Sequence, residues 1–323
     1  MNLGGRPDWG QVFTISFWGR ALRAAALAAA VAAVVVGCVR PPEAADGPND
    51  GSLLEANERL ASITFVSHAT TLIQTGGLNI LTDPYYVQAG HYEPVGVGWE
   101  DLPEIDLVLI SHVHMDHLNR QSLFRLPSTA TLIAPAGVAP FLADEEIQPK
   151  IVLLKPGQSH TVGEVTIAAE EIFHPSRRMV FWGRDTGTLG YVIKGPGYNV
   201  LFVGDSGPRT EYYDVIAERH RVDVAVLPIG PRSHVFHRNH QWPEDAVDAF
   251  ERTGASVMIP VHWRSRRKLT DPRHTTNILR REAARRGLAE NVIVLGHGDT
   301  LFLAPRRPGD PVNRRTRELA GAG

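Results

Sequence analysis

The sequence predicts an α/β fold in which helices cover the faces of β-sheets. Its 323 residues, 43% of them hydrophobic, are enough for one large or two modest domains with a buried core. Between about residues 61 and 305, short apolar runs of strand-like composition alternate with two helical patterns, Pro243–Thr253 and Thr275–Arg286. Strands mixed with helices favour covered sheets with functional residues along one edge. Because no internal boundary is visible, we expect one domain over residues 61–305.

Residues 1–37 have the pattern of a signal peptide. Arg20 and Arg23 precede thirteen small apolar residues, Ala24–Val36, a run too short to span a bilayer comfortably. The segment Val35-Val-Gly-Cys38 resembles a bacterial lipobox, in which the cysteine is acylated and becomes the mature N-terminus. We therefore expect lipidation of Cys38 and a domain outside the cytoplasm, anchored to the cell envelope on its periplasmic or extracellular face. The alternative is an uncleaved N-terminal anchor helix, and the true start could lie downstream of Met1.

Two further segments are expected to lie outside the folded domain. Residues 38–60 are rich in Pro, Ala, Gly, Asp and Glu, which predicts a flexible tether. Residues 306–323 carry five arginines and little that could pack, which predicts a disordered tail; this tail is either solvated or in contact with phospholipid. The net charge of −2 gives no basic field for nucleic acid. Since Cys38 is the single cysteine, any metal must be held by histidine and carboxylate.

Within the expected domain, apolar runs lead into polar residues that could bind a metal or shape a site. The runs at 63–66, 78–81, 107–110, 165–173, 198–203 and 257–261 lead, in order, to His68, Asp83, His112, His174, Asp205 and His262. Taken alone, His174 or His262 would more often be an ordinary polar residue, and Asp83 a turn or capping residue.

The strongest chemical signal is the segment His112-Val-His114-Met-Asp116-His117, directly after the run at 107–110. In extended chain, residues two apart face the same way, so His112 and His114 are aimed at one point. After a bend, Asp116 and His117 can face a second point. Imidazole nitrogen with some carboxylate oxygen is a donor set that Zn²⁺ favours. The segment therefore indicates a two-metal site.

This segment, together with His174, Gly204-Asp205 and Pro260-Val-His262, resembles the metallo-β-lactamase fold superfamily over about residues 62–303. The resemblance implies a four-layer αββα sandwich. Additional motifs resemble the branch that contains N-acyl-phosphatidylethanolamine-hydrolysing phospholipase D and L-ascorbate-6-phosphate lactonase. These motifs include Ser67-His68-Ala-Thr-Thr-Leu, Leu81-Thr-Asp83-Pro, His174-Pro-Ser-Arg-Arg and Asn239-His240-Gln-Trp-Pro-Glu-Asp-Ala.

The resemblance also implies a set of ligands for two divalent cations. One cation would be held by His112, His114 and His174, the other by Asp116, His117 and His262, and Asp205 would bridge them. Asp116 would in addition orient the attacking water as a catalytic residue. We expect Zn²⁺, although iron and manganese also suit histidine and carboxylate.

Several residues are expected around these ligands. Asp83 would hydrogen-bond a ligand imidazole and fix its tautomer. His68 and His240 are candidates for the pocket wall, with surface or structural roles as the alternative, and His240 is the first candidate to protonate the leaving group. Arg177, with Arg178, could contact a phosphate or be a solvated pair. A third metal site is conceivable where His234 and His237 precede His240, but a substrate-facing loop is the preferred interpretation.

The expected function is hydrolysis by a phosphodiesterase of phospholipase D type that acts on membrane phospholipids such as N-acylphosphatidylethanolamine. A lipid tether would raise the local concentration of such a substrate. One alternative is a lactonase or another ester hydrolase; the branch motifs argue against a true β-lactamase. A further alternative is a non-catalytic, metal-stabilised binding protein of the envelope.

Overall fold

The structure is a computed structural model that describes residues 61–87, 94–144, 146–178, 183–230, 238–263 and 272–303. All of them belong to the compact unit Gly51–Gly323. The predicted signal peptide, the tether with Cys38 and the C-terminal tail lie outside the described residues, as do His234 and His237. Among the helices described, none has the length and apolar content needed to cross a bilayer.

Seven described strands form the first sheet, in the order β13-β1-β2-β3-β4-β5-β6. The strands from β13 to β3 pair antiparallel, and those from β3 to β6 pair parallel. Their bounds are Ala61–Ser67 (β1), Thr70–Thr75 (β2), Leu78–Thr82 (β3), Leu107–Leu109 (β4), Thr131–Pro135 (β5), Lys150–Leu154 (β6) and Thr300–Leu303 (β13).

Six described strands form the second sheet, in the order β12-β11-β10-β9-β8-β7. Here β10, β11 and β12 run parallel, and the other pairs are antiparallel. Their bounds are Ser159–Val162 (β7), Val165–Glu171 (β8), Leu189–Lys194 (β9), Asn199–Phe202 (β10), Val224–Pro228 (β11) and Val257–Val261 (β12).

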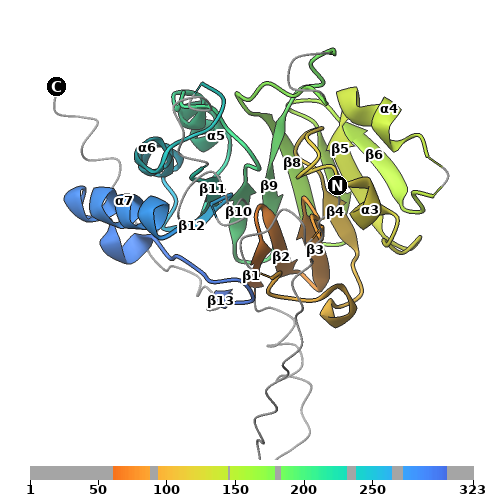
Figure 1. Cartoon of the computed structure of the whole chain (residues 1–323), viewed down its shortest axis with the longest axis horizontal. Helices are drawn as coiled ribbons and strands as arrows, with labels where there is room; N and C mark the ends of the chain where they lie inside the picture. Colours follow the sequence, from red (N-terminus) through yellow and green to blue (C-terminus); the bar gives the residue numbers. More distant parts are fainter. Residues whose placement is uncertain are drawn as a thin grey trace, which may run out of the picture. The chain divides into compact units, whose positions relative to one another are not determined.

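Helices lie on the outer sides of the two sheets, which gives the expected four layers (Figure 1). Two helices flank the first sheet, α3 (Arg120–Leu123) and α4 (Ala139–Leu142). Three flank the second sheet, α5 (Tyr212–Arg219), α6 (Pro243–Thr253) and α7 (Pro272–Arg285). Short 3-10 helices occur at Trp99–Asp101 (η2), Ala136–Val138 (η3) and Ala289–Asn291 (η4).

Strand β4 shows how the sequence produces these layers. Its side chains alternate, so that Leu107 and Leu109 join the core shared by the two sheets, whereas Val108 and the next residue, Ile110, join the cluster that contains Leu123 of α3. Because both faces of the strand are covered, every position is apolar. The strand ends at Leu109, and the polar segment that starts at His112 follows after two further residues.

Local sequence accounts for helix α6, whose bounds are those predicted. Pro243 lies in its first turn, Asp245 Oδ2 accepts a hydrogen bond from the Trp242 backbone N–H at 2.9 Å, and Gly254 ends it with φ +65°. Strand β12 also has its predicted bounds. By contrast, α7 begins at Pro272 instead of Thr275, and β8 ends at Glu171 instead of continuing to Phe173.

The sequence pattern does not predict α5. In this helix only Tyr213 and Ile216 are buried, which is too few for a clear helical period. Its position depends on tertiary packing against α6 and on the buried core, which both buried side chains join.

The two sheets are linked by a buried hydrogen bond that allows a test of their packing. Tyr191 Oη on β9 donates to the backbone carbonyl of Ile110, after β4, at 2.8 Å. Tyr191→Phe should lower the free energy of unfolding by about 1–2 kcal/mol, because the buried carbonyl loses this donor. Urea denaturation measures the effect, and Phe302→Leu, at a position that is 70% exposed, should change it by less than about 0.5 kcal/mol. Equal effects of the two substitutions would contradict the inter-sheet role.

Candidate metal centre

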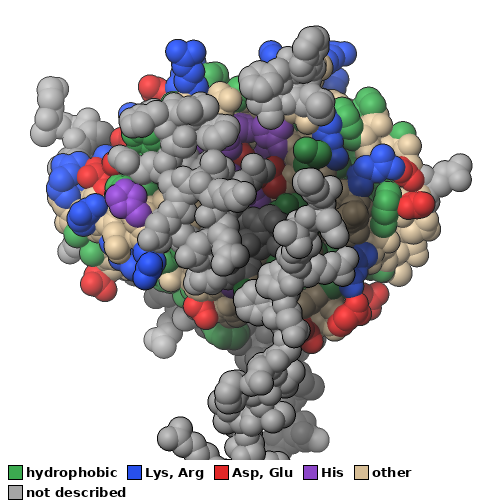
Figure 2. All heavy atoms as spheres, in the orientation of Figure 1, with side chains coloured by type: hydrophobic (Ala, Val, Ile, Leu, Met, Phe, Trp, Pro, Cys, Tyr) green, Lys and Arg blue, Asp and Glu red, His purple; other side chains and the backbone are tan. Residues whose placement is uncertain are grey.

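Loops that follow strands of both sheets bring the predicted ligands together. The segment from His112 to His117 follows β4 of the first sheet, and the other three predicted ligands follow β8, β10 and β12 of the second. All seven side chains converge: His112, His114, Asp116, His117, His174, Asp205 and His262. In the space-filling view, histidine side chains form a patch with acidic side chains beside it (Figure 2).

One group consists of His112, His114, His174 and Asp205. His114 Nδ1 lies 2.8 Å from His112 Nε2 and 3.3 Å from His174 Nε2. Asp205 Oδ2 lies 3.8 Å from each of those two Nε2 atoms. Tetrahedral coordination with Zn–N bonds of about 2.0–2.1 Å places neighbouring nitrogens about 3.4 Å apart. The spacing of this group is therefore close to that of donors around one cation.

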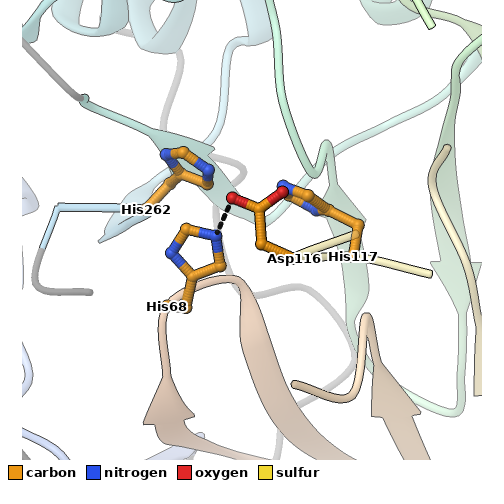
Figure 3. A group of neighbouring side chains, drawn as sticks. All are labelled: His68, Asp116, His117 and His262. Atoms are coloured by element: carbon orange, nitrogen blue, oxygen red, sulfur yellow. Dashed lines mark ion pairs between the residues drawn. The ribbon is translucent and has the colours of Figure 1, made fainter. Parts of the chain in front are cut away.

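The second group consists of His68, Asp116, His117 and His262 (Figure 3). Asp205 also reaches this group, because its Oδ2 lies 3.3 Å from His117 Nε2 and its Oδ1 lies 3.1 Å from His262 Nε2. The carboxylate of Asp205 thus lies between the two groups, the position expected for a bridging ligand.

Acceptors outside the centre orient the imidazoles. His117 Nδ1 faces Asp83 Oδ2 at 2.6 Å. His174 Nδ1 faces the Asn239 carbonyl at 2.7 Å, and His262 Nδ1 faces the Gly230 carbonyl at 2.9 Å. An acceptor at Nδ1 fixes the proton there and leaves the Nε2 lone pair directed at the centre. His117 Nε2, His262 Nε2 and Asp205 Oδ1 are buried and make no hydrogen bond. Such atoms fit a bound cation, because buried polar atoms otherwise require a partner.

Asp83 is buried next to the ligands and orders two of them. Its Oδ2 accepts from His117 Nδ1 and from Ser111 Oγ, each at 2.6 Å, and its Oδ1 accepts from the Ser111 backbone N–H at 2.7 Å. Ser111 Oγ in turn lies 2.9 Å from His112 Nδ1. Only glycine fits at position 204, because φ is +72° and a Cβ would lie 2.3 Å from Ser111 Oγ.

The electrostatic environment keeps most of the donors in the forms that bind metals; His117 is the exception. Burial lowers the pKa of His174 to about 3 and lowers the pKa of His112, His114 and His262, so these imidazoles are neutral at pH 7. Metal binding requires neutral imidazole and ionised carboxylate.

At the two carboxylates, nearby histidines outweigh the effect of burial on the pKa. Burial alone would raise the pKa of Asp116, but the contact with His68 Nε2 and the nearby His117 hold it well below its usual value. Burial is likewise outweighed at Asp205, where His262, His117 and His240 hold the pKa well below the usual range.

For His117, burial opposes protonation, but Asp205 and Asp83 raise its pKa well above the usual value.

The remaining predicted residues occupy different places. His240 Nδ1 lies 3.6 Å from Asp205 Oδ2, with 14% of its side chain exposed, so it borders the centre from the solvent side. His68 is fully buried beside Asp116 and therefore does not form an exposed pocket wall. Arg177 is exposed. Its neighbour Arg178 donates to the Val113 and Leu118 carbonyls at 2.7 and 2.8 Å and so braces the ligand loop.

Sequence reasoning did not identify the bracing role of Arg178 or the carbonyl acceptors of Asn239 and Gly230. Backbone carbonyls carry no side-chain signal, and two adjacent arginines give no indication of which one turns inward. Ser111 could have been suspected, since it directly precedes His112.

Comparisons with known proteins agree with this geometry. The model of a beta-lactamase superfamily domain matches residues 78–263. An uncharacterized protein of Mycobacterium tuberculosis is 32% identical over 222 residues, which are 64% of this chain and 59% of that protein. A UPF0173 metal-dependent hydrolase of Geobacillus is 26% identical over 207 residues, 62% of this chain and 84% of that protein.

Among solved structures, Igni18, a metallo hydrolase from the archaeon Ignicoccus hospitalis, has a TM-score of 0.59 and 21% identity, and the match covers 76% of this chain and 98% of that one. These matches confirm the predicted metallo-β-lactamase fold. The chain spans about three-fifths of the length of the mycobacterial relative.

The contacts of Asp83 generate a prediction. In Asp83→Asn, one carboxylate oxygen becomes an NH₂ group that cannot accept from Ser111 or His117. We expect metal affinity to fall roughly 10–100-fold while the fold is kept, as for other groups that orient a ligand. Chelator competition measures the affinity and circular dichroism the fold. Unchanged affinity would show that His117 needs no orienting acceptor.

Proposed function

The chain belongs to the family of beta-lactamase superfamily domains, whose model covers more than half of it, and we propose that it is a metal-dependent hydrolase whose centre holds two divalent cations. The observation that carries this proposal is the convergence of two His/carboxylate groups on one buried carboxylate, Asp205. The solved metallo hydrolase with this fold and the metal-dependent hydrolase among the relatives support it.

The donors divide into two sets that share Asp205. His112, His114 and His174 would hold one cation, and Asp116, His117 and His262 the other. We propose Zn²⁺, which suits imidazole and carboxylate. When bound, the cations would supply Lewis-acid activation of water and would offset negative charge on the substrate.

The protein's own groups would position the reactants. Asp116, which is ionised, would accept a hydrogen bond from the attacking water and orient it. His240, on the more exposed side of the centre, would donate a proton to the leaving alkoxide. His112 and His117 are fully buried, so neither is accessible for proton transfer to a departing product.

We further propose that the substrate is a phosphodiester of a membrane phospholipid such as N-acylphosphatidylethanolamine, cleaved between the phosphate and the head group. Support comes from the branch motifs around His68, Asp83 and His240, and from the expected lipid anchor at Cys38 in the cell envelope. An anchored enzyme meets its lipid substrate at a raised local concentration. Arg177, exposed directly after Pro175 and Ser176, would contact the phosphate.

Removal of one ligand tests the two-cation centre. The purified protein should contain about two ions per chain by elemental analysis. In His114→Ala one set loses a donor, and we expect the loss of about one ion and a fall in kcat/KM of at least about 100-fold, the scale for losing a charge-stabilising group. His160→Ala, on β7 outside the centre, is the matched control and should match the wild type. Full metal occupancy without turnover of any ester would instead favour a binding protein.

A substrate panel tests the finer proposal. The protein should release phosphatidic acid from vesicles of N-acylphosphatidylethanolamine and hydrolyse bis(p-nitrophenyl) phosphate more slowly, because the small diester lacks the lipid contacts. Lactones and nitrocefin complete the panel, with product formation followed by mass spectrometry and absorbance. Turnover of lactones alone would replace the phosphodiesterase with a lactonase and leave the metal-dependent hydrolase in place.

A further inference from the structure

We infer that His68 is a positioning residue whose Nε2–H holds the carboxylate of Asp116, a role that rests on the proposed function of the centre. His68 lies in the turn between β1 and β2, and 0% of it is exposed. A residue buried in this way cannot contact substrate at a pocket surface. It can act on the reaction only through its neighbours.

The contacts of the ring point to Asp116. His68 Nε2 lies 3.3 Å from Asp116 Oδ2, an ion-pair contact slightly longer than a regular N–H···O hydrogen bond (Figure 3). The centroid of the ring is 3.9 Å from that of His262 and 5.3 Å from that of His117. Figure 3 shows His68 and His117 on different sides of the Asp116 carboxylate. The ring is thus packed in place with one nitrogen directed at a single oxygen.

The second ring nitrogen decides between a hydrogen-bond donor and a metal ligand. In His117, His174 and His262, Nδ1 faces an acceptor for its N–H, which leaves the lone pair of Nε2 free for a cation. Both ring nitrogens of His68 are buried without a hydrogen bond of regular geometry. Nε2 faces the Asp116 carboxylate at 3.3 Å, whereas among the described residues no carboxylate is paired with Nδ1. A proton there would be a buried donor with no acceptor, an arrangement that proteins avoid. The proton therefore belongs on Nε2, facing Asp116, and that nitrogen then has no lone pair for a metal.

The backbone of His68 ties the same turn to a second ligand. Its carbonyl accepts a hydrogen bond from the His262 backbone N–H at 2.8 Å. Both residues have positive φ, +53° at His68 and +61° at His262, a conformation that usually favours glycine. Such a conformation persists only where the surrounding structure holds it, and here the hydrogen bond between the two residues does so. His68 therefore positions two ligands: its ring contacts the Asp116 carboxylate, and its backbone carbonyl binds the His262 N–H.

A pair of variants with a control tests this role. His68→Leu removes the donor, whereas His68→Gln keeps an N–H at a similar distance along the side chain. His220→Gln is the control, because His220 is a largely buried imidazole paired with Glu170 at 2.8 Å, outside the centre. For each protein, Co²⁺ stoichiometry, Co²⁺ affinity by chelator competition, and kcat and KM on the active substrate are measured.

We expect both His68 variants to bind as many ions as the wild type at saturation. His68→Leu should lower the affinity for the ion held by Asp116 roughly 10–100-fold, because Asp116 loses its orientation. For the same reason it should lower kcat by a larger factor than it raises KM. His68→Gln should recover most of both losses, and His220→Gln should match the wild type. If His68→Leu saturates with one ion fewer and an altered Co²⁺ absorption spectrum, His68 is a ligand and the inference fails. Equal losses in the Leu and Gln variants would show a packing role and would also overturn it.

A spectroscopic test needs neither metal nor turnover. Long-range ¹H–¹⁵N spectra of the metal-free wild type, assigned with His68→Gln, report which ring nitrogen of His68 carries the proton. We expect the Nε2–H tautomer, and an Nδ1–H tautomer would refute the inference. Should the wild type bind no metal and hydrolyse nothing, the proposed function fails, while this spectrum still decides the role of His68.

Discussion

A buried carboxylate surrounded by imidazoles is the constraint on which the rest of the structure depends. Asp205 is 1% exposed, and its two oxygens lie 3.1–3.8 Å from nitrogens of five histidines. A buried charge is costly unless opposite charge or hydrogen-bond donors compensate it. Because the surrounding imidazoles come from loops on both sheets, the face-to-face packing of the sheets is what makes this compensation possible.

The contacts one step away from the centre determine its geometry. Asp83, the Asn239 carbonyl and the Gly230 carbonyl each accept a hydrogen bond from one imidazole Nδ1–H, so the nitrogens that face the centre keep their lone pairs. Arg178 holds two carbonyls of the ligand loop. Burial keeps His112 and His262 neutral, and the surrounding histidines keep Asp116 and Asp205 ionised. His117 differs, because Asp205 and Asp83 raise its pKa well above the usual value. The described centre therefore fits cations in its shape and, apart from His117, in the protonation states of its donors.

Backbone strain is concentrated at the same place. In the described part of the chain, the non-glycine residues with positive φ are His68, Asp83 and His262, and all three belong to the centre or touch it. Such conformations cost about 1–3 kcal/mol each and persist only where surrounding structure holds them. Here the hydrogen bonds from His262 to His68 and from Ser111 to Asp83 hold the strained turns. The core of the two sheets supplies the rigidity that these turns require.

Much of the fold and of the centre could be predicted from the sequence, because the relevant signals are local. The apolar run at 107–110 ends where His112 begins, and α6 has its own proline, its acidic cap and its terminal glycine. The spacing of His112, His114, Asp116 and His117 already indicates two groups of ligands. The resemblance to a known superfamily then supplied the order of the layers and the distant ligands.

Tertiary structure decided what depends on residues far apart in the chain. The sequence alone does not separate a pocket wall from a buried neighbour of Asp116. Only folding places His68 beside Asp116, 48 residues away in sequence, with the His262 ring packed against it. Folding also determines that Arg178, and not Arg177, donates hydrogen bonds to the ligand loop. It places backbone carbonyls, which have no sequence signal, beside the ligand imidazoles. The physical reason is that burial and hydrogen-bond partners are set by packing between sheets, whereas periodicity and turn residues act within a few positions of the chain.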